Sequence, residues 1–239
     1  MEINGAVVVV TGASSGIGAA TARAASRAGA RVVLAARRED RLADLAGELD
    51  EAVAVRCDVT DPDQVAALVR TALDAFGRID VLVNNAGQGL QATTEEISLD
   101  DLRAVLELNL VAPLATMQAV LPTMRRQGAG SIVNVSSGTT FADVPGTGGY
   151  VASKIALERL SAIARNELEG TGIAVSTVIP FATSTEFLTA IRAGRADAEA
   201  MTAGADFDPP EQVADAILQL VASGAPRLDL VPAAYGGTR

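Results

Sequence analysis

The stretch AVVVVTGASSGIGAATARAASRAGARVVLAARRED, residues 6–40, contains the pattern that decides the fold. It opens on an apolar run, passes through a glycine turn and an alanine-rich helical segment, and reaches a second apolar run. Apolar runs without regular alternation are typical of parallel strands that are buried on both faces of a sheet. Residues 6–40 therefore predict a strand–helix–strand unit of a parallel sheet.

The rest of the chain repeats this alternation of apolar runs with amphipathic helical stretches. The pattern predicts an α/β fold with a doubly wound, parallel seven-stranded sheet and helices on both faces, as one domain over residues 1–239. The segment 181–210 has no apolar run of its own and is expected to form a substrate loop or lid. The seven expected strands lie within residues 6–12, 31–36, 52–59, 80–87, 130–137, 173–181 and 227–233.

The turn after the first expected strand has the features of a phosphate-binding loop. Gly12, Gly16 and Gly18 let the backbone approach a pyrophosphate, and the following helix N-terminus offers N–H groups and a positive dipole. Their spacing, G-x-x-x-G-x-G, differs from the common dinucleotide pattern G-x-G-x-x-G. A purely structural glycine turn is the alternative, but its place after the first strand favours phosphate binding.

The end of the second expected strand indicates which dinucleotide would bind. A free ribose 2′-hydroxyl is usually met there by a carboxylate, whereas a 2′-phosphate is met by arginine. Ala36 stands at the expected acidic position, and Arg37 and Arg38 follow it. The sequence therefore favours NADP(H) over NAD(H), the alternative being that both arginines are solvated charges at a helix start.

Composition limits the classes of partner and metal site. The chain has 29 acidic and 19 basic residues and a net charge of −10, which argues against binding to nucleic acid. The chain has no histidine and a single cysteine, Cys57, so no metal site is expected. No apolar run approaching about 18 residues and no leader pattern is recognised, so no membrane association and a cytoplasmic location are expected.

Tyr150 and Lys154 stand four residues apart in GGYVASKIALERL, residues 148–160. At that spacing both side chains lie on one face of a helix, where an ammonium group would favour ionisation of the phenol. A solvated surface pair is the alternative interpretation. The pair predicts an acid–base group if the rest of the chain supplies a site.

The motifs TGASSGIG, CDVT, NNAG, SIVNVSS and YVASK, in this order, resemble the short-chain dehydrogenase/reductase family, which has a Rossmann-like fold. The resemblance covers nearly the whole chain and implies the catalytic residues Asn109, Ser137, Tyr150 and Lys154. In this family the tyrosine gives a proton to a carbonyl oxygen, the serine orients that carbonyl, and the lysine lowers the tyrosine pKa and holds the nicotinamide ribose. With the glycine turn and the arginines, the expected cofactor-binding set is Gly12, Ser14, Ser15, Gly16, Ile17, Gly18, Arg37, Arg38, Asp58, Val59, Asn85, Ala86, Gly87, Tyr150, Lys154, Pro180 and Thr185, with Ser14 joining Arg37 at the 2′-phosphate.

Asn109 also has a physical argument of its own. Pro113 lies four residues later in an expected helix, so the carbonyl of Asn109 loses its usual N–H partner and is free to hold a water molecule. Such a water would connect Lys154 to solvent and resupply the proton of Tyr150. A proline kink that serves packing alone is the alternative.

The substrate is indicated only by its class. Phe141, Phe181, Phe187 and Phe207 fall in segments expected to face it, which favours a small, apolar carbonyl or alcohol, although these rings could instead pack the lid. Phe181 stands where the family usually has glycine, and the C-terminal PRLDLVPAAYGGTR departs from the family pattern. The expected activity is that of an NADPH-dependent carbonyl reductase in a homo-oligomer, either a dimer or a tetramer. The alternatives are an idle NADP(H) sensor and a ketoreductase for carrier-bound acyl or polyketide substrates, the latter docking at a local basic patch such as Arg125 and Arg126.

Overall fold

A single parallel sheet of seven strands forms the centre of the protein. The computed structural model describes residues 1–204 and 206–239. The strands stand in the order β3-β2-β1-β4-β5-β6-β7, and each neighbouring pair is parallel, as the apolar runs predict. Their bounds are β1 (Val7–Thr11), β2 (Arg31–Ala36), β3 (Ala52–Arg56), β4 (Val81–Asn84), β5 (Gly130–Val135), β6 (Ile173–Ile179) and β7 (Arg227–Asp229).

The strand order creates a crevice beside β1. The chain moves outward from β1 through β2 to β3, and then returns to the other side of β1 to build β4 through β7. Connections on the two sides of β1 therefore run to opposite sides of the sheet, and the loops after β1 and β4 separate at its carboxyl edge. Open parallel sheets bind ligands at this point.

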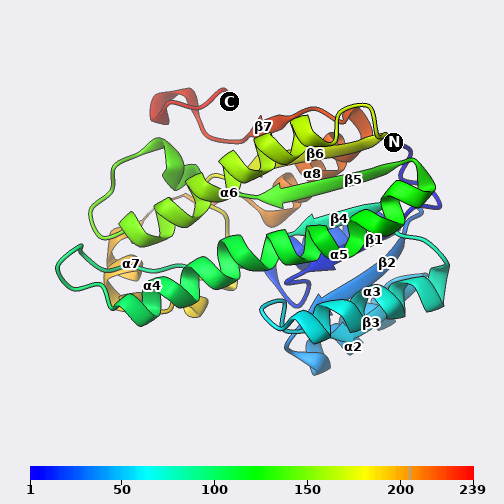
Figure 1. Cartoon of the computed structure of the whole chain (residues 1–239). Helices are drawn as coiled ribbons and strands as arrows, with labels where there is room; N and C mark the ends of the chain where they lie inside the picture. The colour runs from blue at the N-terminus through cyan, green and yellow to red at the C-terminus, as the bar shows by residue number, and fades with distance from the viewer. Residues whose placement is uncertain (205) are drawn as a thin grey trace.

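Helices cover both faces of the sheet, as Figure 1 shows. On one face α1, α2 and α8 pack on the sheet, and on the other α3, α5 and α6 do so. The bounds are α1 (Gly16–Arg27), α2 (Glu39–Glu48), α3 (Pro62–Phe76), α4 (Leu99–Leu106), α5 (Ala112–Gln127), α6 (Gly148–Glu167), α7 (Arg195–Met201) and α8 (Pro210–Ser223), with a π-helical turn η1 (Glu107–Val111) and 3-10 turns η2 (Gly138–Phe141), η3 (Glu186–Ala190) and η4 (Ala233–Tyr235).

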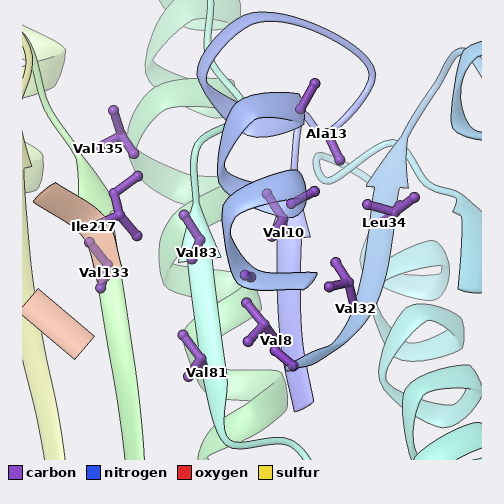
Figure 2. Close-up of a cluster of buried hydrophobic side chains, with 14 of the residues drawn as sticks. Val8, Val10, Ala13, Val32, Leu34, Val81, Val83, Val133, Val135 and Ile217 are labelled. Carbon is purple, nitrogen blue, oxygen red and sulfur yellow. The ribbon is translucent and has the colours of Figure 1, made fainter. Parts of the chain in front are cut away.

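The two faces of the core are lined by alternate residues of the same strands. Val8 and Val10 of β1 point to the face that α8 covers through Ile217, together with valines of neighbouring strands (Figure 2). Val7 and Val9 point to the opposite face. Side chains alternate along a strand, so a strand covered on both faces must be apolar at every position.

The helical stretch Leu99–Gln127, built from α4, η1 and α5, differs from the sequence expectation. Its 29 residues are long and apolar enough to cross a membrane by length and composition alone. In the fold, however, Ala112, Met117 and Val120 are buried in the core cluster between α5 and the sheet. The stretch is therefore a covering helix of the sheet, with charged residues such as Asp100 and Arg125 near its ends.

The expected lid contains the turn η3 and the short helix α7, and residue 205 within it lies outside the described residues. A backbone bridge between Thr183 and Asp208 joins the two ends of this segment. Asp208 also pairs with Arg239, 2.7 Å away, from the C-terminal tail. The last strand is shorter than expected, because β7 ends at Asp229 and the chain then turns into this tail.

Close packing explains the third glycine of the turn after β1. A Cβ at Gly18 would lie 2.4 Å from the carbonyl oxygen of Gly12 and 2.6 Å from Nδ2 of Asn85. Atoms cannot approach so closely, so a side chain at this position would push helix α1 away from the ends of β1 and β4.

Gly18→Ala is therefore expected to lower the free energy of unfolding by about 1 to 3 kcal/mol, because overpacking forces backbone shifts. The measurement is urea denaturation of both proteins. Gly47→Ala is the matched control, since a Cβ at Gly47, inside α2, meets nothing within 4 Å. That control should raise stability by up to about 1 kcal/mol, as alanine does in helix interiors. Equal effects of the two changes would contradict the packing argument.

Candidate active site

The loops after β1 and β4 are joined by hydrogen bonds at the sheet's carboxyl edge. The hydroxyl of Thr11 accepts from the backbone N–H groups of Asn85 and Ala86, at 3.0 and 3.1 Å. The side-chain amide of Asn85 donates to the carbonyls of Thr11 and Gly12. Thr11 is not among the residues predicted from the sequence, where its signal is a polar residue that ends an otherwise apolar strand.

The N-terminus of α1 opens onto this crevice without a side-chain cap. Ser15 is the N-cap residue, but its hydroxyl makes no capping bond to the helix, and the first turn has no acidic residue. Gly16 adopts a left-handed conformation with φ of +52°, and a Cβ there would meet the Thr185 side chain at 2.9 Å. Uncapped N–H groups and the helix dipole make this end suitable for an anion.

Arg38, and not Arg37, contacts the glycine turn. Its guanidinium donates to the hydroxyls of Ser14 at 2.9 Å and Ser15 at 2.7 Å. Arg37 is exposed. Arg38, the N-cap of α2 in extended conformation, thus pairs with Ser14 in the structure, and the expectation that Ser14 joins Arg37 at a 2′-phosphate stays a prediction.

The same arginine reaches the lid. Glu186 of η3 accepts from Arg38 at 2.8 Å and from Arg41 at 2.7 Å. Glu186 and Arg41, with Ser14, Ser15 and Thr185, line a cavity of about 420 Å³ outside the α1 N-terminus. Neither Glu186 nor Arg41 was a sequence-based candidate, since contacts between segments so far apart in the chain leave no local pattern.

Asp58 and Val59 follow β3 at the same edge of the sheet. The carboxylate of Asp58 accepts from the backbone N–H and the hydroxyl of Thr60, at 3.0 and 2.7 Å. Val59 is buried in the core. Both residues therefore lie in the turn between β3 and α3, and their contact with an adenine stays a prediction.

Tyr150 and Lys154 are one turn apart on α6, and both are buried, which excludes the solvated surface pair. The Lys154 ammonium lies 5.9 Å from the centre of the Tyr150 ring and donates to the carbonyl of Val135 at 2.9 Å. The backbone of Gly87 is close to both Lys154 and Asn109, because a Cβ there would be 3.5 Å from Nζ and 3.2 Å from Oδ1. Four sequence candidates thus meet in one place.

Burial controls the ionisation of the pair. It raises the pKa of the Tyr150 phenol to about 12, while a hydrogen bond with Ser137 acts in the opposite direction. It lowers the pKa of the Lys154 ammonium to about 8, while the carboxylate of Glu158 acts to raise it. Desolvation of the phenol is the larger of these influences on Tyr150, and the role of Lys154 in lowering the tyrosine pKa stays a prediction.

Asn109 lies in the π-helical turn η1 between α4 and α5. Its side-chain amide donates to the carbonyl of Gln88 at 2.9 Å and to Ser153 at 3.1 Å, and its Oδ1 accepts from the N–H of Gln88 at 3.0 Å. Ser153 donates in turn to the carbonyl of Tyr150 at 2.6 Å. A wide turn just before Pro113 agrees with the argument that proline disrupts the helix here. The water on the Asn109 carbonyl stays a prediction.

Two aromatic pairs lie in the segments expected to face the substrate, and one of them includes Tyr150. Phe187 of η3 lies with its ring centre 5.7 Å from that of Tyr150, in a cluster with Leu90 and Val105. Phe181 follows Pro180, whose carbonyl accepts from Gly138 at 2.7 Å, and it packs against Tyr235 of the C-terminal tail at 5.1 Å between ring centres. The departures noted at Phe181 and at the C-terminus are therefore parts of one wall.

A family model described as short chain dehydrogenase matches residues 6–196, which is most of the chain. The chain belongs to the short-chain dehydrogenase family. This short-chain dehydrogenase is therefore an oxidoreductase, in agreement with the resemblance in its motifs.

Relatives of this short-chain dehydrogenase extend the comparison. A protein of Staphylococcus saprophyticus, named an uncharacterized oxidoreductase, is 41% identical over 184 residues, which cover 75% of each chain. A short-chain dehydrogenase/reductase from Burkholderia phymatum in complex with NAD superposes with a TM-score of 0.92 at 28% identity, over 99% of this chain and 92% of the other. An alcohol dehydrogenase from the archaeon Thermococcus sibiricus, complexed with 5-hydroxy-NADP, superposes with a TM-score of 0.82 at 30% identity, over 94% and 95%.

The buried Lys154 is expected to make stability depend on pH in a defined direction. Its pKa is about 8 in the folded protein, below the ordinary value of 10.5, so the unfolded chain binds this proton more tightly. A rise in pH through that interval therefore favours the folded state. Relative to Lys154→Met, the wild-type free energy of unfolding should rise by about 2 to 3 kcal/mol between pH 7 and pH 10.

Urea denaturation of the two proteins at several pH values measures this difference. Titration of Tyr150 above pH 10 changes the free energy of unfolding of both proteins, so it cancels when the two values are subtracted. A constant difference across the range would show that Lys154 titrates as it does in the unfolded chain.

Proposed function

We propose that this short-chain dehydrogenase is an NADP(H)-dependent carbonyl reductase, which also runs in reverse as an alcohol dehydrogenase. The observation that carries the proposal is the meeting of Tyr150, Ser137 and Lys154 beside an anion-binding helix end that has Arg38 at its rim. A sensor of nucleotides has no use for a buried proton donor, so the enzyme is favoured over an idle binding protein.

The described residues fit a nicotinamide dinucleotide with a 2′-phosphate. The uncapped α1 N-terminus after Gly16 suits the pyrophosphate, and Arg38 with Ser14 suits a phosphate on the adenosine ribose. Solved relatives of the family are complexed with NAD in one case and with 5-hydroxy-NADP in another, so the arginine carries the preference for NADP(H). When bound, the nicotinamide supplies hydride to a carbonyl carbon or accepts it from an alcohol.

The chain's own residues supply the proton and the positioning. The pKa of Tyr150 lies well above neutral pH, so the phenol is protonated there and can donate its proton to the carbonyl oxygen as negative charge develops on it. Ser137 holds the same oxygen by a hydrogen bond, and Lys154 holds the ribose hydroxyls. Asn109 fixes the backbone of Gln88 and, through Ser153, that of Tyr150.

The aromatic wall supports small or flat apolar ketones and aldehydes as substrates. Phe187 packs against Tyr150 and Phe181 packs against Tyr235, and these apolar rings support a small, flat substrate. We also place the protein in the cytoplasm as a homo-oligomer. Val111, Ile155 and Ile163 are exposed on the helices of the Asn109 and Tyr150 regions, which supports association through that surface.

Tyr150→Phe is expected to lower kcat for NADPH-dependent ketone reduction about 100- to 10,000-fold, because the proton donor is removed. The dissociation constant for NADPH should change by less than about threefold, since the ring stays in place. Steady-state kinetics over a panel of ketones, aldehydes and diketones, with NADH in parallel, measure this. Tyr235→Phe, the same change at the other tyrosine, is the control and should keep its activity. Tight NADPH binding without turnover of any carbonyl in the wild type would favour the sensor or a carrier-bound substrate.

Arg38→Met should raise the dissociation constant for NADP(H) about 10- to 100-fold, because charge-assisted hydrogen bonds to a phosphate are lost. Binding of NADH, which has no 2′-phosphate, should change little. Arg37→Met is the matched control, because its arginine is the exposed neighbour. Calorimetric titration of both variants decides between the two arginines, and a larger loss in Arg37→Met would restore the pairing expected from sequence.

A further inference from the structure

Glu186 holds two arginines in the manner of a phosphate. One carboxylate oxygen accepts from Nη1 of Arg38 at 2.8 Å, and both oxygens accept from Nη1 of Arg41 at 2.7 Å. Arg38 extends at the same time to the hydroxyls of Ser14 and Ser15. A bridging anion with several charge-assisted hydrogen bonds is the arrangement that a ribose phosphate makes with arginine side chains.

The charges at this position disfavour simultaneous binding of the Glu186 carboxylate and a phosphate to the two arginines. Two guanidinium groups meet one carboxylate, which leaves a single positive charge in excess. A phosphate monoester carries about −1.5 to −2 at neutral pH, so its arrival beside Glu186 would give the site an excess of negative charge. Arg38, Arg41 and Glu186 are each more than 40% exposed, so their ion pairs are weak enough for a phosphate to displace the carboxylate.

The turn that carries Glu186 is also attached to the catalytic tyrosine. The next residue, Phe187, is partly buried, lies against the ring of Tyr150 and packs with Ile97 and Ala193 against the buried Leu90. Its N–H donates to Thr185, which begins the turn. The first two residues of the 3-10 turn η3 are therefore held in different ways, Glu186 by the two arginines and Phe187 by the aromatic contact over the proton donor.

We infer that Glu186 is a specificity-determining residue that occupies the place of the cofactor's 2′-phosphate and is displaced by it, and that this displacement releases Phe187 from Tyr150. The inference rests on the proposed preference for NADP(H). Recognition of the 2′-phosphate at the adenosine end of the cofactor would thus control access of the substrate to the Tyr150 phenol. A ligand without the 2′-phosphate leaves Glu186 on its arginines and the turn in place.

Two adenosine ligands that differ by one phosphate test the inference without turnover. Adenosine 2′,5′-bisphosphate and adenosine 5′-monophosphate are titrated calorimetrically into the wild type and into Glu186→Gln. Removing the competing charge should tighten binding of the bisphosphate about 3- to 10-fold and change binding of the monophosphate by less than about twofold. Glu199→Gln is the matched control, since Glu199 is also in the lid but pairs with Arg195 within α7.

Amide hydrogen exchange of residues 186–192 provides the second readout. In the wild type the bisphosphate should speed exchange of this segment, and the monophosphate should not. In Glu186→Gln the segment should exchange faster before any ligand is added, because one of its two attachments is gone. An unchanged melting temperature shows that the variant is folded.

Three results bear on the outcome. Selective tightening together with faster exchange supports the inference. A wild type that prefers the bisphosphate while Glu186→Gln leaves that preference and the exchange rate unchanged overturns the role of Glu186 and leaves the proposed cofactor preference standing. Equal affinity of both ligands for both proteins overturns the preference for NADP(H) and the inference with it.

Discussion

The hydroxyl of Thr11 holds the two loops at the switch point of the sheet together, and the rest of the site depends on that contact. It accepts from two consecutive N–H groups after β4, so the chain after β1 cannot move away from the chain after β4. At this separation there is no room for a side chain at Gly18. Helix α1 then starts at a fixed place, and its N-terminus points into the crevice where the chain divides.

Much of the fold could be predicted because a strand that is buried on both faces of a sheet must be apolar at every position, which makes it visible in the sequence as an apolar run. All seven expected strands are present, from β1 to the short β7, and the motif residues at the strand ends do meet along one edge. The positions of strand ends and the side-chain directions in turns were harder to predict from the sequence. The choice between Arg37 and Arg38 depends on the backbone angles at the start of α2, where consecutive side chains diverge, and residue type gives no information about that.

Spacing could predict that Tyr150 and Lys154 are neighbours, but not that both are buried beneath a third segment. Burial decides the direction of both pKa shifts, and for Tyr150 it comes partly from Phe187 of the distant turn η3. The ion pairs of Glu186 have the same origin, since they join the lid to a helix about 145 residues earlier. Such contacts are set by how the lid folds back over the sheet, which a local pattern does not contain.

The buried ammonium of Lys154 has a consequence for the substitutions that this position can accept. A charged side chain with no carboxylate bonded to it weakens the fold at neutral pH, and many single substitutions to an apolar residue would relieve that burden. Loss of stability to a charged group in the core is typical of functional sites, so a substitution that stabilises this position would remove the ammonium on which the proposed chemistry depends.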